Sequence, residues 1–160
     1  MQDNIDFCRK VKQMEILKIK RLRENTALPK RATPGSAGMD LCACIEEEIT
    51  INPGDLVTIP TGIAIALPSE NYMANIYARS GLGVKHGICL SNGVGVIDSD
   101  YRGEVCVGLC NISKVPYTVT PGERVAQLVT QPVAIMDVEE VDVLDDTFRG
   151  EGGFGSTGKK

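Results

Sequence analysis

The sequence predicts an all-β domain, a jelly-roll-like barrel or sandwich, for three reasons. Its 17 glycines and 8 prolines are spread along 160 residues and mark many turns. Between the turns, apolar residues recur in short runs with the period of two that is typical of strands. No long helical pattern separates these runs, and only residues after Asp137 could hold a helical turn. Short strands joined by Gly/Pro turns are typical of sandwiches, jelly rolls and barrels.

The strands can be placed in order along the chain. Residues 63–67 alternate large and small side chains, which suits a strand packed on both faces, and Asp40 faces opposite to Leu41. Turn and loop residues at 29–38 and 52–55 separate neighbouring runs. We expect strands at 14–20, 39–44, 49–51, 56–59, 63–67, 72–78, 88–90, 105–110, 117–119, 124–130 and 133–136.

Composition limits the class of protein. At 160 residues the chain predicts one domain, and 42% hydrophobic with 24% charged residues is ordinary for a globular protein. A net charge of −4 argues against a nucleic-acid partner, because binding to the phosphate backbone needs clustered Lys and Arg. No apolar run reaches membrane-spanning length and no signal peptide is evident, so we expect no membrane partner and a cytoplasmic location.

The cysteines predict no metal centre. There are 6 cysteines and a single histidine, His86, and no two cysteines form a C-x-x-C pair. Zinc ligands at familiar spacing are therefore missing from the sequence. We expect the thiols to be reduced and to serve as small buried filler within strands.

Residues 93–105, GVGVIDSDYRGEV, predict a hairpin with reactive groups near its bend. Asp98 and Tyr101 lie three residues apart there, and Gly93 and Gly95 leave backbone groups open to a flat ligand. A tight turn whose aspartates only bond their own backbone is the alternative for this stretch by itself.

Two further stretches could bind an anion. Residues 78–83, ARSGLG, follow a strand and combine a guanidinium, a hydroxyl and glycine-flanked amides, although a plain β-turn explains them equally well. In 121–128, PGERVAQL, Gln127 is expected on the same face as Val125 and Val129. A buried amide needs hydrogen-bond partners, from the protein or from a ligand.

The C-terminal stretch 149–160, RGEGGFGSTGKK, is rich in glycine and is expected to be mobile without a ligand. It resembles a Walker loop in part, but Lys160 replaces the Ser or Thr and the stretch lacks a flanking strand and helix. It still offers phosphate-binding groups in Arg149, Ser156 and Thr157, with Phe154 as a flat apolar lid.

Together these stretches resemble, in order, the five motifs of the trimeric dUTPase family. Residues 37–41 (AGMDL) resemble the first motif, and 78–83, 93–105, 121–128 and 149–158 resemble the other four. The resemblance runs from about residue 14 to the C-terminus. It implies an N-terminal extension at 1–13, a β domain at 14–148 and a mobile arm at 149–160 that closes over the active site.

The resemblance also implies roles for matching residues. Asp98 corresponds to the carboxylate that activates the attacking water, and Tyr101 to the residue that packs under the deoxyribose. Asp40 corresponds to a residue near the metal, which it contacts through water. The uracil pocket corresponds to Asn92, Val96 and Ile97, with Cys106 opposite Asn92 if the hairpin bends about Ser99. Phosphate and closing-arm contacts correspond to Arg79, Ser80, Gly81 and Gln127, and to Arg149, Phe154, Gly155 and Ser156.

The activity implied is hydrolysis of dUTP to dUMP and pyrophosphate with Mg²⁺, which lowers dUTP and supplies dUMP for thymidylate synthesis. The family forms homotrimers whose active sites are shared between subunits. With no carboxylate cage in the sequence, Mg²⁺ is expected on the phosphates and water. Two alternatives remain: a dCTP deaminase or bifunctional relative on the same fold, and a non-catalytic trimeric binding or regulatory protein.

Overall fold

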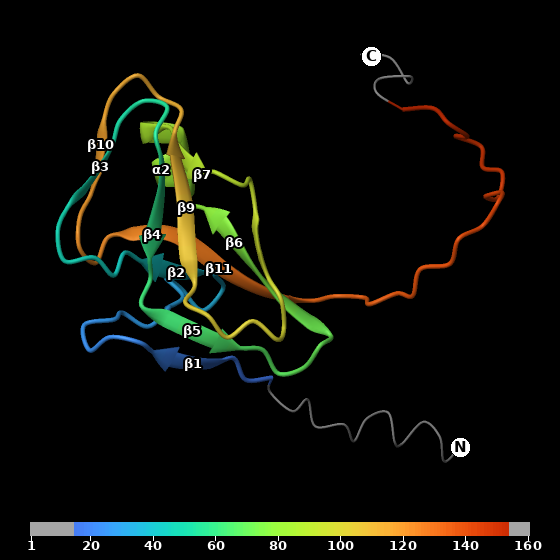
Figure 1. Cartoon of the computed structure of the whole chain (residues 1–160), viewed down its shortest axis with the longest axis horizontal. Helices are drawn as coiled ribbons and strands as arrows, with labels where there is room; N and C mark the ends of the chain where they lie inside the picture. The colour runs from blue at the N-terminus through green and yellow to red at the C-terminus, as the bar shows by residue number, and fades with distance from the viewer. Residues whose placement is uncertain (1–14, 154–160) are drawn as a thin grey trace.

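The computed structural model describes residues 15–153, and this part is a body of short antiparallel strands with one short helix (Figure 1). In chain order the elements are β1 (Lys18–Arg21), β2 (Met39–Cys42), β3 (Ile49–Ile51), β4 (Leu56–Pro60), β5 (Ile63–Ala66), β6 (Tyr72–Ala78), α2 (Ser80–His86), β7 (Ile88–Leu90), β8 (Gly95–Ile97), β9 (Cys106–Asn111), β10 (Tyr117–Val119) and β11 (Arg124–Pro132). The prediction of a mostly β fold is confirmed.

The strands form four small sheets. The order is β2-β11-β6-β8 in the four-stranded sheet and β4-β9-β7 in the three-stranded sheet, and the pairs β1-β5 and β10-β3 complete the body. Alternation buries one face of β9: Val107 and Leu109 are each 1% exposed, whereas Cys106 is exposed. The core is aliphatic, with Leu41, Ile51, Ile59, Ile63, Ile88 and Leu128 among its largest fully buried side chains.

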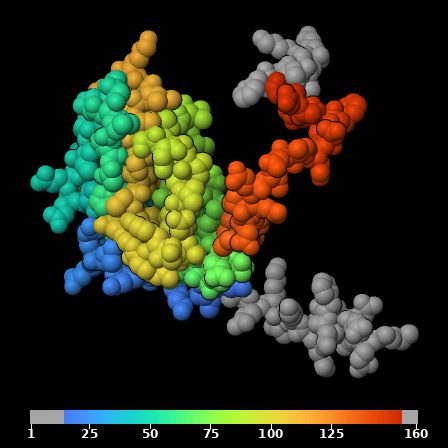
Figure 2. All heavy atoms as spheres, turned by 45° about the vertical axis from the view of Figure 1, so that its right-hand side comes forward, coloured from blue at the N-terminus to red at the C-terminus, as the bar shows by residue number. Residues whose placement is uncertain are grey.

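Most predicted strands are present, and several differ from the prediction at their ends; β1, for example, begins at Lys18 and not at residue 14. The strand predicted at 133–136 is absent. The pairing of β11 with β6 ends at Pro132, opposite Tyr72. Beyond that point the chain leaves the body as an extended arm (Figures 1 and 2), and its apolar side chains, such as Ile135 and Met136, are exposed. An alternating pattern alone makes no strand where no neighbouring strand can pair.

The expectation that only residues after Asp137 could be helical is wrong, because α2 spans Ser80–His86. Gly81 and Gly83 lower the helix propensity of this segment and conceal it in the sequence. The helix is fixed by tertiary contacts instead. Leu82 is buried in the core, and Gly87, with φ of 66°, caps the C-terminus by donating its N–H to the carbonyls of the last turn.

Residues 93–105 do not form a paired hairpin. β8 pairs with β6, whereas β9, which follows the bend, pairs with β4 and β7. The two arms of the predicted hairpin therefore belong to different sheets, and the bend spans the gap between them. This separation opens the pocket described below.

A bulge in β11 changes the predicted position of Gln127. The pairing of β11 with β2 shifts between Arg124 and Ala126, so Val125 and Ala126 are both buried. Gln127 then lies on the opposite face from Ala126 and Leu128. The expected alignment of Gln127 with Val125 is wrong, because the bulge breaks the period of two between them.

The described cysteines are free thiols, as predicted, but they are not buried filler. Cys106 is exposed, and the other described cysteines are half-buried. Cys89 and Cys110 are in register on β7 and β9, with their Sγ atoms 3.4 Å apart. Burial and the neighbouring thiol raise the pKa of Cys89, which keeps it protonated.

Within residues 15–153, no helix is both long and apolar enough to span a lipid bilayer.

Candidate active site

A pocket of about 300 Å³ lies where β8, the bend after it, and β9 meet. Six of the predicted site residues line it together: Asn92, Val96, Ile97, Asp98, Tyr101 and Cys106. Cys106 and Asn92 both line this pocket, although residues 93–105 do not form the paired hairpin on which the prediction for Cys106 depended; Asn92 lies in the turn between β7 and β8, and Cys106 begins β9.

Glycines bring backbone to the pocket wall. Gly95 lies so close to β6 that an added Cβ would be 3.1 Å from Cβ of Ile76. Gly93 has φ of 73°, a conformation that other residues adopt at a cost, and it turns the chain into β8. The wall next to Val96 and Ile97 therefore presents main-chain groups as well as side chains to a ligand.

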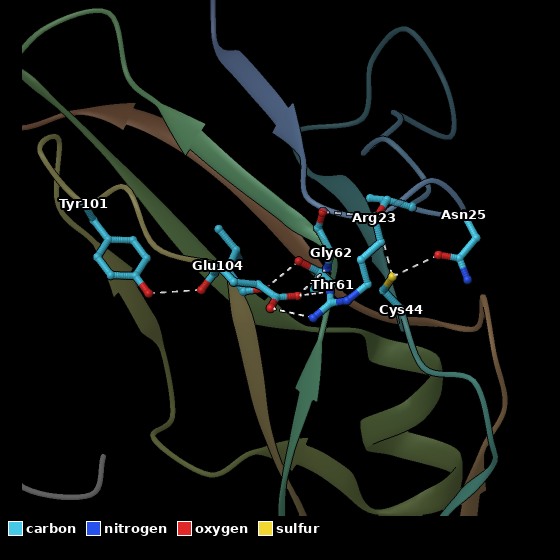
Figure 3. A network of polar contacts seen from close by, with 9 residues as sticks. Arg23, Asn25, Cys44, Thr61, Gly62, Tyr101 and Glu104 are labelled. Atoms are coloured by element: carbon cyan, nitrogen blue, oxygen red, sulfur yellow. Dashed lines mark hydrogen bonds and ion pairs between the residues drawn. The ribbon is translucent and has the colours of Figure 1, made fainter.

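The bend after β8 fixes Tyr101 beside Asp98. The Tyr101 N–H donates to the carbonyl of Asp98 at 3.2 Å, and the Tyr101 hydroxyl donates to the carbonyl of Glu104 at 3.0 Å (Figure 3). The ring lies against Gly103, where an added Cβ would be 2.6 Å from Cζ of Tyr101. Asp98 and Tyr101 are both exposed at the pocket, which leaves the Asp98 carboxylate open to water and substrate.

The charge of this pocket is negative. Asp98 and Glu104 line it, and no Lys or Arg does so among residues 15–153. It can therefore receive a neutral ring and a sugar, but it lacks the cations that a triphosphate requires.

A second cluster holds the predicted phosphate-binding residues, and none of its described members lines the pocket. Nε of Arg79 donates to Oδ1 of Asp40 at 3.1 Å, and Nη1 of Arg124 donates to Oδ2 at 2.9 Å. Gln127 sits opposite Asp40 in the β2–β11 pair and donates from Nε2 to the carbonyl of Ala78 at 3.0 Å.

The cluster and the pocket lie on different strands of one sheet. In the order β2-β11-β6-β8, Asp40 is on the edge strand β2, Gln127 is on β11 and Arg79 follows β6, whereas the pocket is at the β8 edge. Ser80 and Gly81 begin α2 directly after β6 and belong with the cluster through Arg79, the N-cap residue. The structure of one chain thus does not bring the predicted base and the predicted phosphate-binding groups into one pocket.

The fifth motif lies partly outside the described residues. Arg149 is exposed and donates from Nε to the carbonyl of Gly152 at 2.6 Å. The predicted residues Phe154, Gly155 and Ser156 fall outside residues 15–153, as does the whole of the predicted extension at 1–13.

A metal cage is missing from the described part of the chain, where no three His, Cys, Asp or Glu side chains converge. Asp40, predicted to lie near the metal, has its two carboxylate oxygens in ion pairs with Arg79 and Arg124. Because both of its oxygens are paired with arginines, Asp40 positions these two cationic side chains and is a poor direct ligand for Mg²⁺.

Sequence reasoning missed Glu104 and Arg124 as site residues. Glu104 lines the pocket and Arg124 shares Asp40, yet both lie within motifs that were identified. Arg124 lies opposite Cys42 and so comes close to Asp40. This position depends on the register between β2 and β11, which no local sequence pattern reveals. No local pattern marks Glu104, because its partner Arg23 is 81 residues away in the sequence.

The geometry can be compared with known proteins. A family model described as dUTPase matches residues 24–158. The chain belongs to the dUTPase family. Two relatives are named deoxyuridine 5′-triphosphate nucleotidohydrolase. The protein of Desulfitobacterium hafniense is 53% identical over 144 residues, which cover 89% of this chain and 95% of the length of that relative. The protein of Hahella chejuensis is 51% identical over 152 residues, which cover 94% of this chain and 100% of the length of that relative.

Solved structures of dUTPases share the fold. The dUTPase of Staphylococcus bacteriophage 80alpha with bound dUpNHpp matches with a TM-score of 0.82 at 26% identity, covering 89% of this chain and 98% of that chain. A dUTPase from phage phi11 of S. aureus, described with a structural Mg(II) ion, matches with a TM-score of 0.74 at 23% identity and covers 82% of this chain and 99% of that chain. The predicted membership of the dUTPase family is confirmed.

Proposed function

We propose that this dUTPase-family chain hydrolyses dUTP to dUMP and pyrophosphate, with Asp98 as the base that activates water. The observation that carries the proposal is the pocket, where a carboxylate, a tyrosine ring and a glycine-lined backbone wall meet. Relatives at about half identity carry the name of that activity, which favours it over a deaminase or a non-catalytic protein.

Uracil would be selected by the backbone of the pocket wall. Main-chain N–H and C=O groups near Val96 and Ile97 can pair with the edge of a uracil ring, and a ring held against this wall would bring a 5-methyl group into collision with it. Loss of matched hydrogen bonds discriminates far more than a methyl group does, because it leaves buried polar groups unpaired. Tyr101 beneath the sugar would exclude a 2′-hydroxyl.

Catalysis would begin with a water held by Asp98 in line with the α-phosphorus. Asp98 takes a proton from that water as the P–O bond forms, and pyrophosphate leaves. Positioned general-base help of this kind is worth about 10²–10⁴-fold. The larger requirement is positive charge around the phosphate oxygens, which the pocket does not supply.

We infer that the phosphates are bound by Arg79, Ser80, Gly81 and Gln127 of a second copy and by Arg149 and Ser156 of residues 149–160. Phe154 would stack on the uracil ring as these residues, Gly155 among them, close over the site. None of Asp40, Arg79, Arg124 and Gln127 lines the pocket, and this supports a site built by more than one chain. Exposed apolar residues in the segment between Pro132 and Arg149, including Val138, Val143 and Leu144, also suit packing on another subunit. A homotrimer is the assembly that we propose.

Mg²⁺ would bind through the triphosphate and water, since the described residues build no cage for it. When bound, the ion would offset the negative charge of the phosphate oxygens. Asp40 would contribute by orienting Arg79 and Arg124, and a water-mediated contact to the ion is its proposed further role. A cytoplasmic location belongs to this proposal as well.

The proposal is tested by the Asp98→Asn variant, which is nearly isosteric but cannot accept the proton. Turnover of dUTP should fall by about 10²-fold or more, while binding of a non-hydrolysable dUTP analogue survives. Release of pyrophosphate from dUTP and of ammonia from dCTP should be measured side by side. Unchanged turnover by the variant, or ammonia as the product, would overturn the assignment.

A further inference from the structure

We propose that Glu104 is a positioning residue for Tyr101, and that Arg23 holds Glu104 in place. The inference rests on the proposed function, in which Tyr101 lies under the deoxyribose and excludes a 2′-hydroxyl. Figure 3 shows the chain of contacts that leads from Arg23 through Glu104 to the tyrosine ring.

The Glu104 carboxylate is held from two directions. Arg23 pairs with it through two parallel hydrogen bonds, Nη1 to Oε1 at 2.5 Å and Nη2 to Oε2 at 3.0 Å. The N–H of Gly62 donates to Oε1 at 2.7 Å. Two-point pairing of a guanidinium with a carboxylate fixes orientation as well as distance.

The anchor at Gly62 is itself rigid. Gly62 has φ of 72°, and an added Cβ would lie 2.3 Å from Oγ1 of Thr26. The Thr26 hydroxyl, on a residue only 4% exposed, donates to the Gly62 carbonyl at 3.1 Å. Glu104 is therefore attached to a buried turn between β4 and β5, and not to a flexible loop.

Val105, the residue after Glu104, is also hydrogen-bonded to the segment around the turn between β4 and β5. The Val105 N–H donates to the Ile63 carbonyl at 2.8 Å, and the Thr61 hydroxyl donates to the Val105 carbonyl. Side chain and backbone together thus set the place of the Glu104 carbonyl oxygen.

That carbonyl is what orients Tyr101. The tyrosine hydroxyl donates to it at 3.0 Å, and the ring rests on Gly103. Tyr101 is 45% exposed, so little other packing restrains it. A shift of the Glu104 backbone would move the ring in the pocket, where both residues form part of the wall.

The consequence is a role in sugar selection. If the ring loses its place, the space that excludes a 2′-hydroxyl opens, and the preference for dUTP over UTP falls. The expected fall in the ratio of kcat/KM values is about tenfold, comparable to discrimination by one small group. Because Tyr101 also bonds the Asp98 carbonyl, turnover of dUTP can change as well, so the readout is the ratio of kcat/KM for dUTP and UTP and not turnover of dUTP alone.

The experiment compares Glu104→Gln, Arg23→Met and the double variant, each assayed with Mg²⁺ on dUTP and on UTP. Both single variants should lower the dUTP-to-UTP ratio, and the double variant should do no worse than Glu104→Gln, because both changes break one link. Glu70→Gln, in an exposed turn, is the matched charge control and should leave the ratio unchanged. Arg23→Met tests the same link if Glu104→Gln is poorly folded.

A purely structural role would lower melting temperature and the active fraction while leaving the ratio constant, and that result would overturn the inference. Tyr101→Phe and Tyr101→Ala separate this failure from failure of the proposed function. If Tyr101→Ala leaves the ratio unchanged, the proposed role of the ring is wrong. If Tyr101→Ala lowers the ratio and Glu104→Gln does not, only the positioning role of Glu104 is wrong.

Discussion

Asp40 accepts a hydrogen bond from Nε of Arg79 at 3.1 Å, which ties β2 to the residue that follows β6. The side chains are 26% and 19% exposed for Arg79 and Asp40, so the pair is partly shielded from water. Arg124 shares the same carboxylate at 2.9 Å. The three side chains form a cationic unit that one carboxylate holds in place.

Asp40→Asn should therefore weaken phosphate binding without touching the pocket. An amide can hold at most one of the two guanidinium groups well, and it leaves the arginines with less restraint. We expect KM for dUTP to rise about tenfold, with a smaller change in binding of deoxyuridine, measured by steady-state kinetics and calorimetry. Equal losses for deoxyuridine and dUTP would show that Asp40 supports the fold and not the phosphates.

Acid should destabilise the protein through Glu104. Its hydrogen bonds with Arg23 keep the pKa of the Glu104 carboxyl below its usual range. A lowered folded-state pKa stabilises the fold above the unfolded pKa, and this contribution is lost as the pH falls through the folded-state value.

Thermal unfolding of wild type and Glu104→Gln between about pH 6 and pH 3 checks this sign. The difference in melting temperature between the two proteins should shrink as the pH falls. A difference that stays constant or grows on acidification would show that the Arg23 pair contributes nothing through its charge.

Deleting residues 150–160 should reduce turnover strongly and leave stability almost unchanged. The chain beyond Pro132 leaves the body in Figure 1, and Arg149 contacts only its own segment among the described residues. Ordering the five glycines within 149–160 costs backbone entropy that a bound nucleotide would offset. Turnover, melting temperature and mass by light scattering should be measured together. Full turnover would make the segment a simple tail, and loss of the fold would make it structural.

The sequence predicts the strands well, because alternation is a local signal that burial enforces. Val107 and Leu109 point inward as their spacing predicts. It fails where a tertiary contact overrides the local pattern. Gly81 and Gly83 hide α2, whose stability comes from the burial of Leu82.

In the site, too, local sequence patterns predict some features and tertiary contacts determine the others. The six predicted residues that line the pocket lie within or directly beside one continuous motif, 93–105, and all six meet there. Strand partners do not follow from that motif, so the separation of β8 and β9 into two sheets was missed. The pair of Arg23 and Glu104 spans 81 residues and has no local signature at all.

The central claim is that Asp98 of one copy and Arg79 of another complete one active site. It is tested most directly by mixing two inactive variants, Asp98→Asn and Arg79→Ala, unfolding them together and refolding them at equal amounts. Each variant alone should be nearly inactive and should assemble to the same mass as wild type. The mixture should recover about one quarter of wild-type turnover, because random assembly pairs an intact Asp98 with an intact Arg79 across that fraction of interfaces. A mixture no more active than its parents would contradict a site shared between copies.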